Sequence, residues 1–352
     1  MALMRLSAES KLVLALVSLG ALAGALGAEL VSRAFEERIE AVGAAALTRA
    51  NEAFRAQQAA EVEKLEATLD ALMASRELRA AFVKRDRVGL QRLAEPILEV
   101  LRERGHVTHW YFHEPGPTHR VFLRVHKPEL FGDTVDRTTL RRAAETGEQG
   151  AGLELGRTAF ALRVVRPWIV DGQLLGYMEL AEEVTRFLAT LKSRTADQYG
   201  LLIEKRFIDE KAWAAVLGPR ANTWNARPDV LVVDAADFTD GIAQFDGDIE
   251  RLPEAGRVLG ETERPAGTFI RGVYPIADAA GRRVAALFVV HDFTAHHAAV
   301  RGGRTQAFVI LLLLALAGTV TTVGLVRWLI FSRLAEPRQR LERRVDGRAP
   351  GV

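Results

Sequence analysis

Two apolar runs, one near each end of the chain, constrain its fold more than any other feature. Residues 12–31 (LVLALVSLGALAGALGAELV) hold a single charged residue, Glu29, and residues 307–326 (AFVILLLLALAGTVTTVGLV) hold none. Each run has about the 20 residues that a helix needs to cross the hydrocarbon core of a bilayer. The sequence therefore predicts two membrane-spanning helices, over residues 12–32 and 305–328.

The first run has a second interpretation, because Arg5 and Lys11 precede it and Ala25-Leu26-Gly27 is a passable cleavage site for a signal peptide. We favour a retained helix, since the run is longer than the apolar core of a typical signal peptide. Gly20 and Gly24 form a GxxxG pair that could pack against another helix, or they are simply the small residues that are common in such helices.

The orientation follows from the basic residues that flank the two runs. The basic residues of the N-terminus and of the tail are Arg5, Lys11, Arg327, Arg333, Arg338, Arg340, Arg343, Arg344 and Arg348. By the positive-inside tendency we expect residues 1–11 and 329–352 to be cytoplasmic, although Arg301 and Arg304 weaken the contrast. Nearly everything else that can fold would then lie outside the cytoplasm.

The composition excludes few function classes but removes two. The formal net charge is only +2, because 47 basic and 45 acidic residues nearly cancel, so nucleic-acid binding gains no support. The chain has no cysteine, which excludes a disulfide framework and a thiol active site.

Residues 33–82 favour a long stalk helix that rises from the membrane. They contain no proline and are rich in Ala, Glu, Leu and Arg. Val62, Leu65, Leu69 and Leu72 recur at steps of three and four, so they share one face of a helix. We expect this face to pack partly on the chain's own domain and partly on a second copy, in a homodimer.

Between the stalk and the second apolar run, the order of expected elements repeats in residues 83–192 and 193–304. Helices and short-turn strands in this order indicate an α+β fold, with two tandem PAS-like modules built on antiparallel sheets. We expect Pro96 to kink or split the first module's opening helix, residues 87–104. The first module's predicted strands are 107–113, 120–127, 159–170 and 174–182, with a helix over 138–146. The second module's are 200–208, 229–235, 267–278 and 284–293, with a helix over 209–218 that Gly218-Pro219 closes.

The first module resembles the membrane-distal module of double Cache sensor domains. The likeness is carried by FHEPGPTHRVFLRVHKPELFGDTVDR, then GLELG, ALRVVRP and LGYMELAEEV. The second module is similar to the proximal Cache module, in YGLLIEKRFIDEKAW and RGVYPIADAAGRRVAALFVVHD. Such domains lie outside the membrane in bacterial two-component sensor kinases, diguanylate cyclases and chemoreceptors. The resemblance implies a two-pass protein of the bacterial inner membrane, with a periplasmic main domain that binds ligands mostly in its distal module.

The stretch VFLRVHK (121–127) carries the most specific signal for a site. Aliphatic residues alternate there with Phe122, Arg124 and His126, so one face of the strand presents an aromatic ring, a guanidinium and an imidazole. A guanidinium offers a planar fork of donors suited to a carboxylate, and it keeps its charge when buried. We therefore expect a pocket for a small anionic or polar ligand. The candidate ligand-binding residues are Trp110, Phe112, Arg124, His126, Arg163, Arg166, Tyr177 and Glu179.

The other candidates follow from strand parity. Trp110 and Phe112 share one face and could supply an apolar wall. Arg163 and Arg166 have opposite parity, so we expect only one of them to face the pocket. Tyr177 and Glu179 share a face, but Glu179 could instead pair with an arginine. All of these residues could equally form structural ion pairs, and Asp133, after Gly132, is expected to serve a turn.

A metal site is a lesser alternative. Five of the eight histidines fall within 21 residues: His106, His109, His113, His119 and His126. Imidazole is a common ligand for zinc, copper and nickel, and neighbouring strands could bring two of these rings together. No HExxH or Cys/His spacing accompanies them. We expect neither a cofactor nor an enzyme, since RGGRT (301–305) lacks the spacing of a phosphate-binding loop.

The sequence thus predicts a membrane-anchored sensor. The residues after the second run resemble at most the first helix of a HAMP segment around Pro337, so we expect a separate histidine kinase or diguanylate cyclase to supply the output. The competing interpretation is a non-sensing membrane scaffold, or a truncated remnant of a sensor kinase or cyclase.

Overall fold

The computed structural model describes residues 8–156, 160–195, 197–216, 224–233, 245 and 248–345. Its contacts divide the chain into two units, one of residues 42–293 and one that combines residues 1–41 with residues 294–352. Arg5, Ala159, Gly218-Pro219, Asp234-Ala235 and Arg348, on which some expectations rest, lie outside the described residues.

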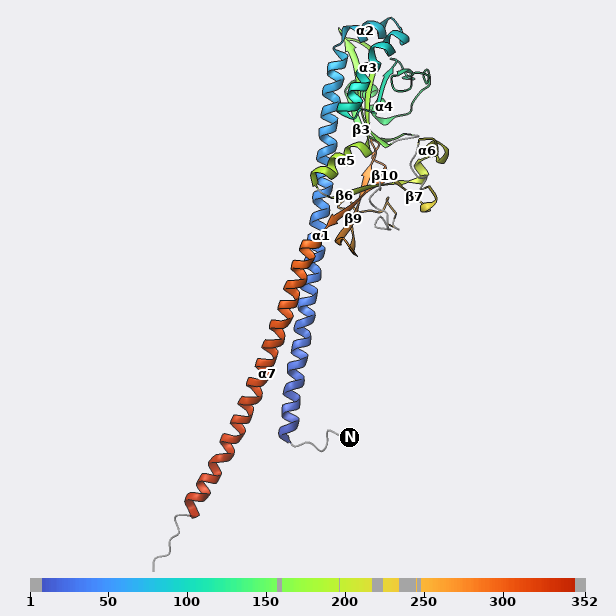
Figure 1. The fold of residues 1–352 in the computed structure, drawn as a ribbon. Coiled ribbons are helices and arrows are strands. Elements are labelled where there is room, and N and C mark those ends of the chain that lie inside the picture. The colour runs from blue at the N-terminus through green and yellow to red at the C-terminus, as the bar shows by residue number, and fades with distance from the viewer. Residues whose placement is uncertain are drawn as a thin grey trace, which may run out of the picture. The chain divides into compact units, whose positions relative to one another are not determined.

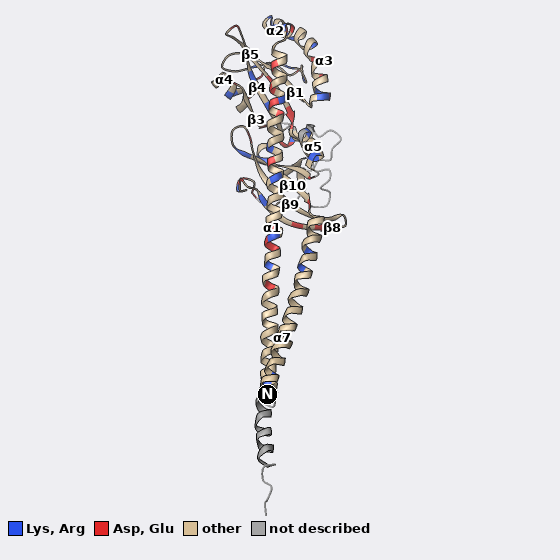
Figure 2. Cartoon of the chain, turned by 90° about the vertical axis from the view of Figure 1, so that its left-hand side faces the viewer, with Lys and Arg blue, Asp and Glu red and all other residues tan. Residues whose placement is uncertain are grey.

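The unit that combines the two ends of the chain consists of apolar helices. It contains the first part of α1 (Ala8–Met73) and all of α7 (Thr294–Val345). Both helices are long and apolar enough to cross a membrane, and their apolar stretches are not buried in protein. Figure 2 shows a stretch without charged side chains in each. The α+β architecture with two flanking apolar helices is as expected.

Small residues let these two helices approach closely. A methyl group added to Gly20 would lie 2.5 Å from Thr319 Oγ1, and one added to Gly24 would lie 3.8 Å from the Ala315 methyl. The GxxxG pair therefore faces α7 of the same chain, and the absence of side chains at these positions permits the contact.

The unit of residues 42–293 holds two antiparallel sheets of five strands each (Figure 1). The first sheet has the order β2-β1-β5-β4-β3, and the second has the order β7-β6-β10-β9-β8, so the same connectivity occurs twice. This repeat confirms the expected pair of modules with antiparallel sheets. The first module contains α2 (Arg76–Val83), α3 (Arg87–Gly105), β1 (His109–His113), β2 (Val121–Arg124), α4 (Thr138–Thr146), β3 (Gly150–Leu155), β4 (Phe160–Val170) and β5 (Gln173–Glu183). The second contains α5 (Val184–Thr195), β6 (Gln198–Glu204), α6 (Glu210–Val216), β7 (Val230–Val233), β8 (Arg257–Arg264), β9 (Gly267–Ala277) and β10 (Arg283–Asp292).

The core of the first module lies between one face of its sheet and helices α1, α2 and α3. Leu65 and Leu69 of α1 are fully buried there, as the apolar stripe predicts. The sheet contributes Trp110, Phe112, Leu123, Val164, Met178 and Leu180. A smaller cluster on the other face joins Leu140 and Ala143 of α4 to Val165 and Tyr177. The rest of that second face is free to form a site.

Several local features differ from the sequence expectation. Helix α3 is not split at Pro96, because this proline lies on the exposed side of the helix, where water can bond the carbonyl of Arg92 that it leaves without a donor. The strand predicted over 120–127 ends at Arg124, where a turn begins. The edge strands β3 and β8, and helix α5, were not anticipated.

Candidate functional site

The register of the first sheet gathers polar residues on the face that points away from α1. Tyr111 on β1 lies opposite Arg124 on β2 and opposite Glu179 on β5. Glu179 lies opposite Val165 on β4, and Arg163 is two residues before Val165, so it shares this face. Four neighbouring strands therefore bring a phenol, two guanidiniums and a carboxylate together.

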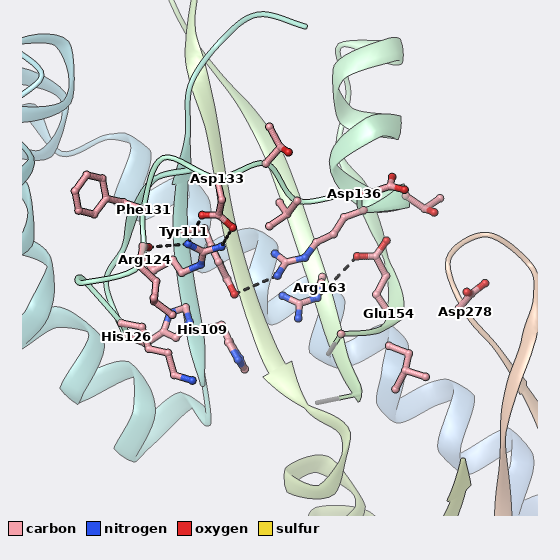
Figure 3. Close-up of a pocket in the computed structure, with 18 of the residues that line it drawn as sticks. His109, Tyr111, Arg124, His126, Phe131, Asp133, Asp136, Glu154, Arg163 and Asp278 are labelled. Carbon is pink, nitrogen blue, oxygen red and sulfur yellow. Dashed lines mark hydrogen bonds and ion pairs between the residues drawn. The ribbon is translucent and has the colours of Figure 1, made fainter. Parts of the chain in front are cut away.

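Tyr111, Arg124 and Arg163 form part of the wall of a cavity of about 700 Å³ (Figure 3). The wall is made by the sheet, by the segment that follows β2 and by the end of β3. Asp278 and Arg282, from the turn between β9 and β10, complete it. The lining residues are His109, Tyr111, Arg124, His126, Lys127, Glu129, Leu130, Phe131, Asp133, Thr134, Val135, Asp136, Arg137, Thr138, Glu154, Leu155, Gly156, Arg163, Asp278 and Arg282.

A fully buried carboxylate, Glu179, organises the cations of the cavity. Its Oε1 accepts hydrogen bonds from Nη1 of Arg137 and, at 2.6 Å, from Nη1 of Arg163, and its Oε2 lies 3.0 Å from Nε2 of His113. Burial alone would raise the pKa of Glu179, but the charges of the two arginines outweigh it and hold that pKa well below its usual value. One ionised carboxylate is thus shared by two guanidiniums.

Arg163 has donor capacity that the protein does not use. Its side chain is 3% exposed, and its buried Nε has no hydrogen-bond partner among the described residues. Oε2 of Glu154 lies 3.8 Å from this atom and is hydrogen-bonded to Thr139. Burial raises the pKa of Glu154, which weakens it as a counter-charge. A buried donor without an acceptor is costly, so this position favours an acceptor from outside the chain.

Arg124 is engaged differently. Its Nη1 and Nη2 each donate a 2.7 Å hydrogen bond to the carboxylate of Asp133, and Nη1 also donates to the carbonyl of Leu130 at 2.7 Å (Figure 3). Arg124 therefore fixes the segment that follows β2 as a wall of the cavity, and two of its donor nitrogens are already occupied.

Two neutral histidines form another part of the wall. Nδ1 of His126 accepts from the backbone N–H of Trp110 at 3.3 Å, and burial lowers the pKa of His126 to about 3, so its proton sits on Nε2. Nδ1 of His109 is 2.8 Å from Thr108 Oγ1, which itself donates to the carbonyl of Ala181. His109 Nδ1 is therefore the donor to that hydroxyl, and its Nε2 is an acceptor. The pKa of His109 is also well below its usual value, chiefly through burial.

Comparison with known proteins assigns the chain to a family. No curated protein sequence matches the chain. A family described as the double sensory domain of two-component sensor kinases matches residues 44–225, which is more than half of the chain. The chain belongs to this double Cache family. The match includes the whole first module and its cavity-forming strands.

Several solved structures are similar to the double Cache domain. The periplasmic domain of Vibrio cholerae LuxQ is 11% identical over 69% of this chain and 98% of its own, with a TM-score of 0.42. The domain of a putative sensory box/GGDEF family protein from Vibrio parahaemolyticus is 15% identical over 72% and 97%, with a TM-score of 0.40. The ligand-binding domain of the Campylobacter jejuni chemoreceptor Tlp3, in complex with L-valine, is 11% identical over 75% and 96%, with a TM-score of 0.32.

Family membership supports an extracytoplasmic sensing role. The two apolar helices flank a double Cache domain, which lies outside the cytoplasm in its family, and this is consistent with a two-pass inner-membrane protein.

The structure brings four of the sequence-predicted residues together. Arg124, His126 and Arg163 line the cavity, and Glu179 lies beneath it as the shared counter-charge. Tyr177 is on the same face as Glu179, but it packs in the cluster under α4.

The remaining three sequence-predicted residues lie on the opposite face of the sheet. Trp110 and Phe112 are buried in the core beneath α1, so the expected apolar wall is not part of the cavity. Arg166 forms ion pairs with Asp70 and Glu66 of α1. As the strand parity indicated, only one of Arg163 and Arg166 faces the cavity.

Sequence reasoning did not select Tyr111, Arg137 or Glu154. Tyr111 had a usable signal, because it alternates with Trp110 and Phe112 and so belongs to the polar face of β1. Arg137 lies just before α4, and Glu154 lies on an edge strand that was not predicted, so neither position had a periodic signal.

The histidines that are close in sequence do not form one group in the structure. The rings of His109 and His126 are 4.6 Å apart, whereas His113 contacts Glu179, and His119 packs against Tyr177. Within the described part of the chain, no three His, Cys, Asp or Glu side chains are grouped as metal ligands would be.

Proposed function

We propose that the first module of this double Cache protein binds a small polar ligand that carries a carboxylate, in the cavity beside Arg163. The protein would be an inner-membrane sensor that passes this signal to a cytoplasmic output protein, such as a histidine kinase or diguanylate cyclase. The observation that supports the proposal most directly is that Arg163 lines the cavity and that its buried Nε has no hydrogen-bond partner among the described residues.

The distribution of charge favours a carboxylate over a cation. Five basic and five acidic side chains line the cavity. Three of the acids already have an arginine partner: Asp133 pairs with Arg124, Asp136 with Arg141 and Asp278 with Arg282. Arg137 and Arg163 share the single carboxylate of Glu179, so their two positive charges exceed its one negative charge. An incoming carboxylate would restore the balance and supply the missing acceptor.

The neutral imidazoles add selectivity. With its proton on Nε2, His126 can donate, whereas His109 Nε2 can accept. A ligand with a hydroxyl or amino group beside its carboxylate would therefore find partners for both. Because neither ring is charged at neutral pH, they would recognise hydrogen-bonding pattern rather than net charge.

Signalling requires that the ligand prefer one conformation of the module. Arg137 is well placed for this, because it immediately precedes α4 and donates to both Glu179 and the hydroxyl of Tyr111. A ligand that moves Arg137 toward the cavity would therefore also move the start of α4. We propose a homodimer as the signalling unit.

The test is a thermal-shift measurement on the full-length protein in lipid nanodiscs. The panel contains acetate, succinate, citrate, L-alanine, L-glutamate, putrescine and zinc chloride. A ligand at one hundred times its dissociation constant stabilises the native state by about 2.7 kcal/mol, so binding raises the melting temperature. We expect a carboxylate to do so in the wild type and in Arg166→Gln, but not in Arg163→Gln. This pair is matched, since each removes one arginine of β4, on opposite faces of the sheet.

Other outcomes would point elsewhere. A shift with zinc alone would favour a metal sensor that uses histidines. No shift with any compound, from a protein that melts cooperatively, would contradict ligand binding by this panel's chemistry and favour a membrane scaffold or a remnant.

A further inference from the structure

The turn between β9 and β10 of the second module docks on the first module. The backbone N–H of Ala279 donates to the carbonyl of Leu153 on β3 at 2.7 Å, and Nη2 of Arg142 on α4 donates to the carbonyl of Ala279 at 3.0 Å. Figure 3 shows Asp278 on this turn, beyond Glu154 at the edge of the cavity. The turn therefore touches both elements that flank the cavity on that side.

Gly152 on the edge strand β3 permits the close approach of the turn. Gly152 has φ +151°, and a methyl group there would lie 2.9 Å from Cβ and 3.2 Å from Cα of Ala279. Contacts under 3.0 Å are not tolerated between carbon atoms, so any side chain at Gly152 would push the turn outward. By contrast, Gly172 in the β4–β5 turn, with φ +78°, has nothing within 4 Å of the corresponding position.

The turn is internally rigid and holds one guanidinium at the cavity. Asp278 has a side chain only 3% exposed, and its Oδ1 accepts from the backbone N–H groups of Ala280 and Arg282, both at 2.9 Å. Its Oδ2 accepts from Nε of Arg282 at 2.8 Å and from Nη2 at 2.6 Å. Nη1 of Arg282 makes no hydrogen bond to any described residue, and the side chain lines the cavity while remaining 63% exposed.

We propose that the cavity is a two-module site, in which Arg282 of the second module binds the outer end of the ligand whose inner end reaches Arg163. The ligand would carry a second hydrogen-bond acceptor, such as a carboxylate or carbonyl oxygen, at that outer end. Through the docked turn, ligand binding in the cavity would change the position of β10. This strand ends at Asp292, just before α7 begins at Thr294. The ligand part of this inference rests on the proposed function, whereas the docking of the turn does not.

The docking is tested by amide hydrogen exchange, measured by mass spectrometry on full-length protein in nanodiscs. We expect Gly152→Ala to speed exchange in peptides that cover residues 278–283 by about tenfold, because the Ala279 N–H loses its acceptor. The control is Gly172→Ala, which also places a side chain at a positive φ but meets no neighbour, and we expect it to leave these peptides unchanged. Arg142→Ala removes a bond to the turn without introducing a clash, and we expect a smaller increase. Wild-type exchange in both Gly152→Ala and Arg142→Ala would overturn the docking.

The ligand contact is tested with whichever panel compound stabilises the wild type. We expect Arg282→Gln to weaken its affinity about tenfold, the loss typical of one charge-assisted hydrogen bond. Arg251→Gln, an exposed arginine of the same module outside the cavity, should leave the affinity unchanged. Equal affinities in these two variants would overturn the two-module site while leaving the proposed function standing. If no compound binds the wild type, the proposed function and the role of Arg282 both fall, and the exchange result still decides whether the turn couples the modules.

Discussion

Arg124 on β2 and Asp133, nine residues further along the chain, form two parallel hydrogen bonds of 2.7 Å each. The same segment is held by the backbone, since the N–H of Val121 donates to the carbonyl of Asp133 and the N–H of Gly132 donates to that of Val121. The segment that follows β2 and forms a wall of the cavity is therefore held in place at Gly132 and Asp133. The arginine that the sequence suggests for a ligand shapes the site by holding this wall.

We predict that Arg124 and Asp133 are energetically coupled. Asp133 has a side chain 55% exposed, which limits the pair to about 1 kcal/mol in a double-mutant cycle of Arg124→Ala and Asp133→Asn, read from thermal unfolding. Arg124→Lys should not restore it, because an ammonium cannot donate two parallel bonds. The control pair is Arg141 and Asp136, both largely exposed, with an expected coupling near zero. Equal coupling in the two cycles would show that the clamp is not energetically special.

The fold was largely predictable because its signals are periodic. The apolar runs specify α1 and α7, and alternation specifies the central strands β1, β4 and β5, which are buried on at least one face. The missed strands β3 and β8 are edge strands with mixed burial, and β3 begins with glycines at positions 150 and 152. At Gly150 and Gly152 the sequence suggests a turn, whereas the structure uses the lack of a side chain for close approaches of backbone.

The site was predictable only in part, for a different reason. Parity correctly separated Arg163 from Arg166, because alternation fixes which residues share a face. It does not say which face meets the core, so Trp110 and Phe112 gave no indication that they pack against α1. Arg137 and Arg282 come from a loop and a turn, where no period exists, and only tertiary structure brings them to the cavity.

We predict that Glu179→Gln destabilises the protein by about 3 kcal/mol or more. The change leaves the buried guanidiniums of Arg137 and Arg163 without their shared counter-charge, and breaking a buried ion pair from one side costs about that much. Thermal unfolding measures the loss. In the double variant with Arg163→Gln, part of the stability should return, because one of the two unpaired charges is gone. Glu183→Gln, a neutralisation at the end of the same strand, is the control with little expected effect.

The pH dependence of stability should report on Glu182, at the contact between β5 and α1. Lys64 Nζ donates to its Oε2 at 2.7 Å and also pairs with Glu61. Burial raises the pKa of Glu182 from 4.5 to about 7. Between these values folded Glu182 keeps a proton that the unfolded chain has released, so the contribution of Glu182 to stability falls as pH rises from about 4.5 to about 7 and is constant above about pH 7. For Glu61 burial acts upward, but Lys64 lowers the pKa overall, so its titration lies below this window.

The variant Glu182→Gln tests this prediction. Without the buried charge, the stability of the variant relative to the wild type should rise by an amount on the order of 2 kcal/mol between pH 5 and pH 7, and the variant should be more stable than the wild type above about pH 7. Melting temperatures across this range measure the effect. Glu63→Gln, on the exposed side of α1, should keep the wild-type slope. A slope that is unchanged in Glu182→Gln would mean that Glu182 is ionised throughout the window.

The contact between α1 and α7 can be captured as a disulfide. A Cβ atom at position 24 would lie 3.8 Å from the Cβ of Ala315, and Cβ atoms in a disulfide are usually separated by about this distance. The chain has no cysteine of its own. We therefore expect Gly24→Cys with Ala315→Cys to cross-link within one chain on mild oxidation in membranes, as seen by mass spectrometry of linked peptides.

Four further variants decide what Gly20 and Gly24 pack against. Leu22→Cys with Leu316→Cys, at positions whose native side chains are 58% and 60% exposed, should not cross-link within the chain. Adding Gly20→Leu to the productive pair should lower its yield, because the new side chain meets Thr319, whereas Gly318→Leu, with nothing within 4 Å, should not. If Gly24→Cys alone gives covalent dimers more readily than the pair gives internal links, the glycines serve contact between two copies, and the packing of α1 on α7 of the same chain is contradicted.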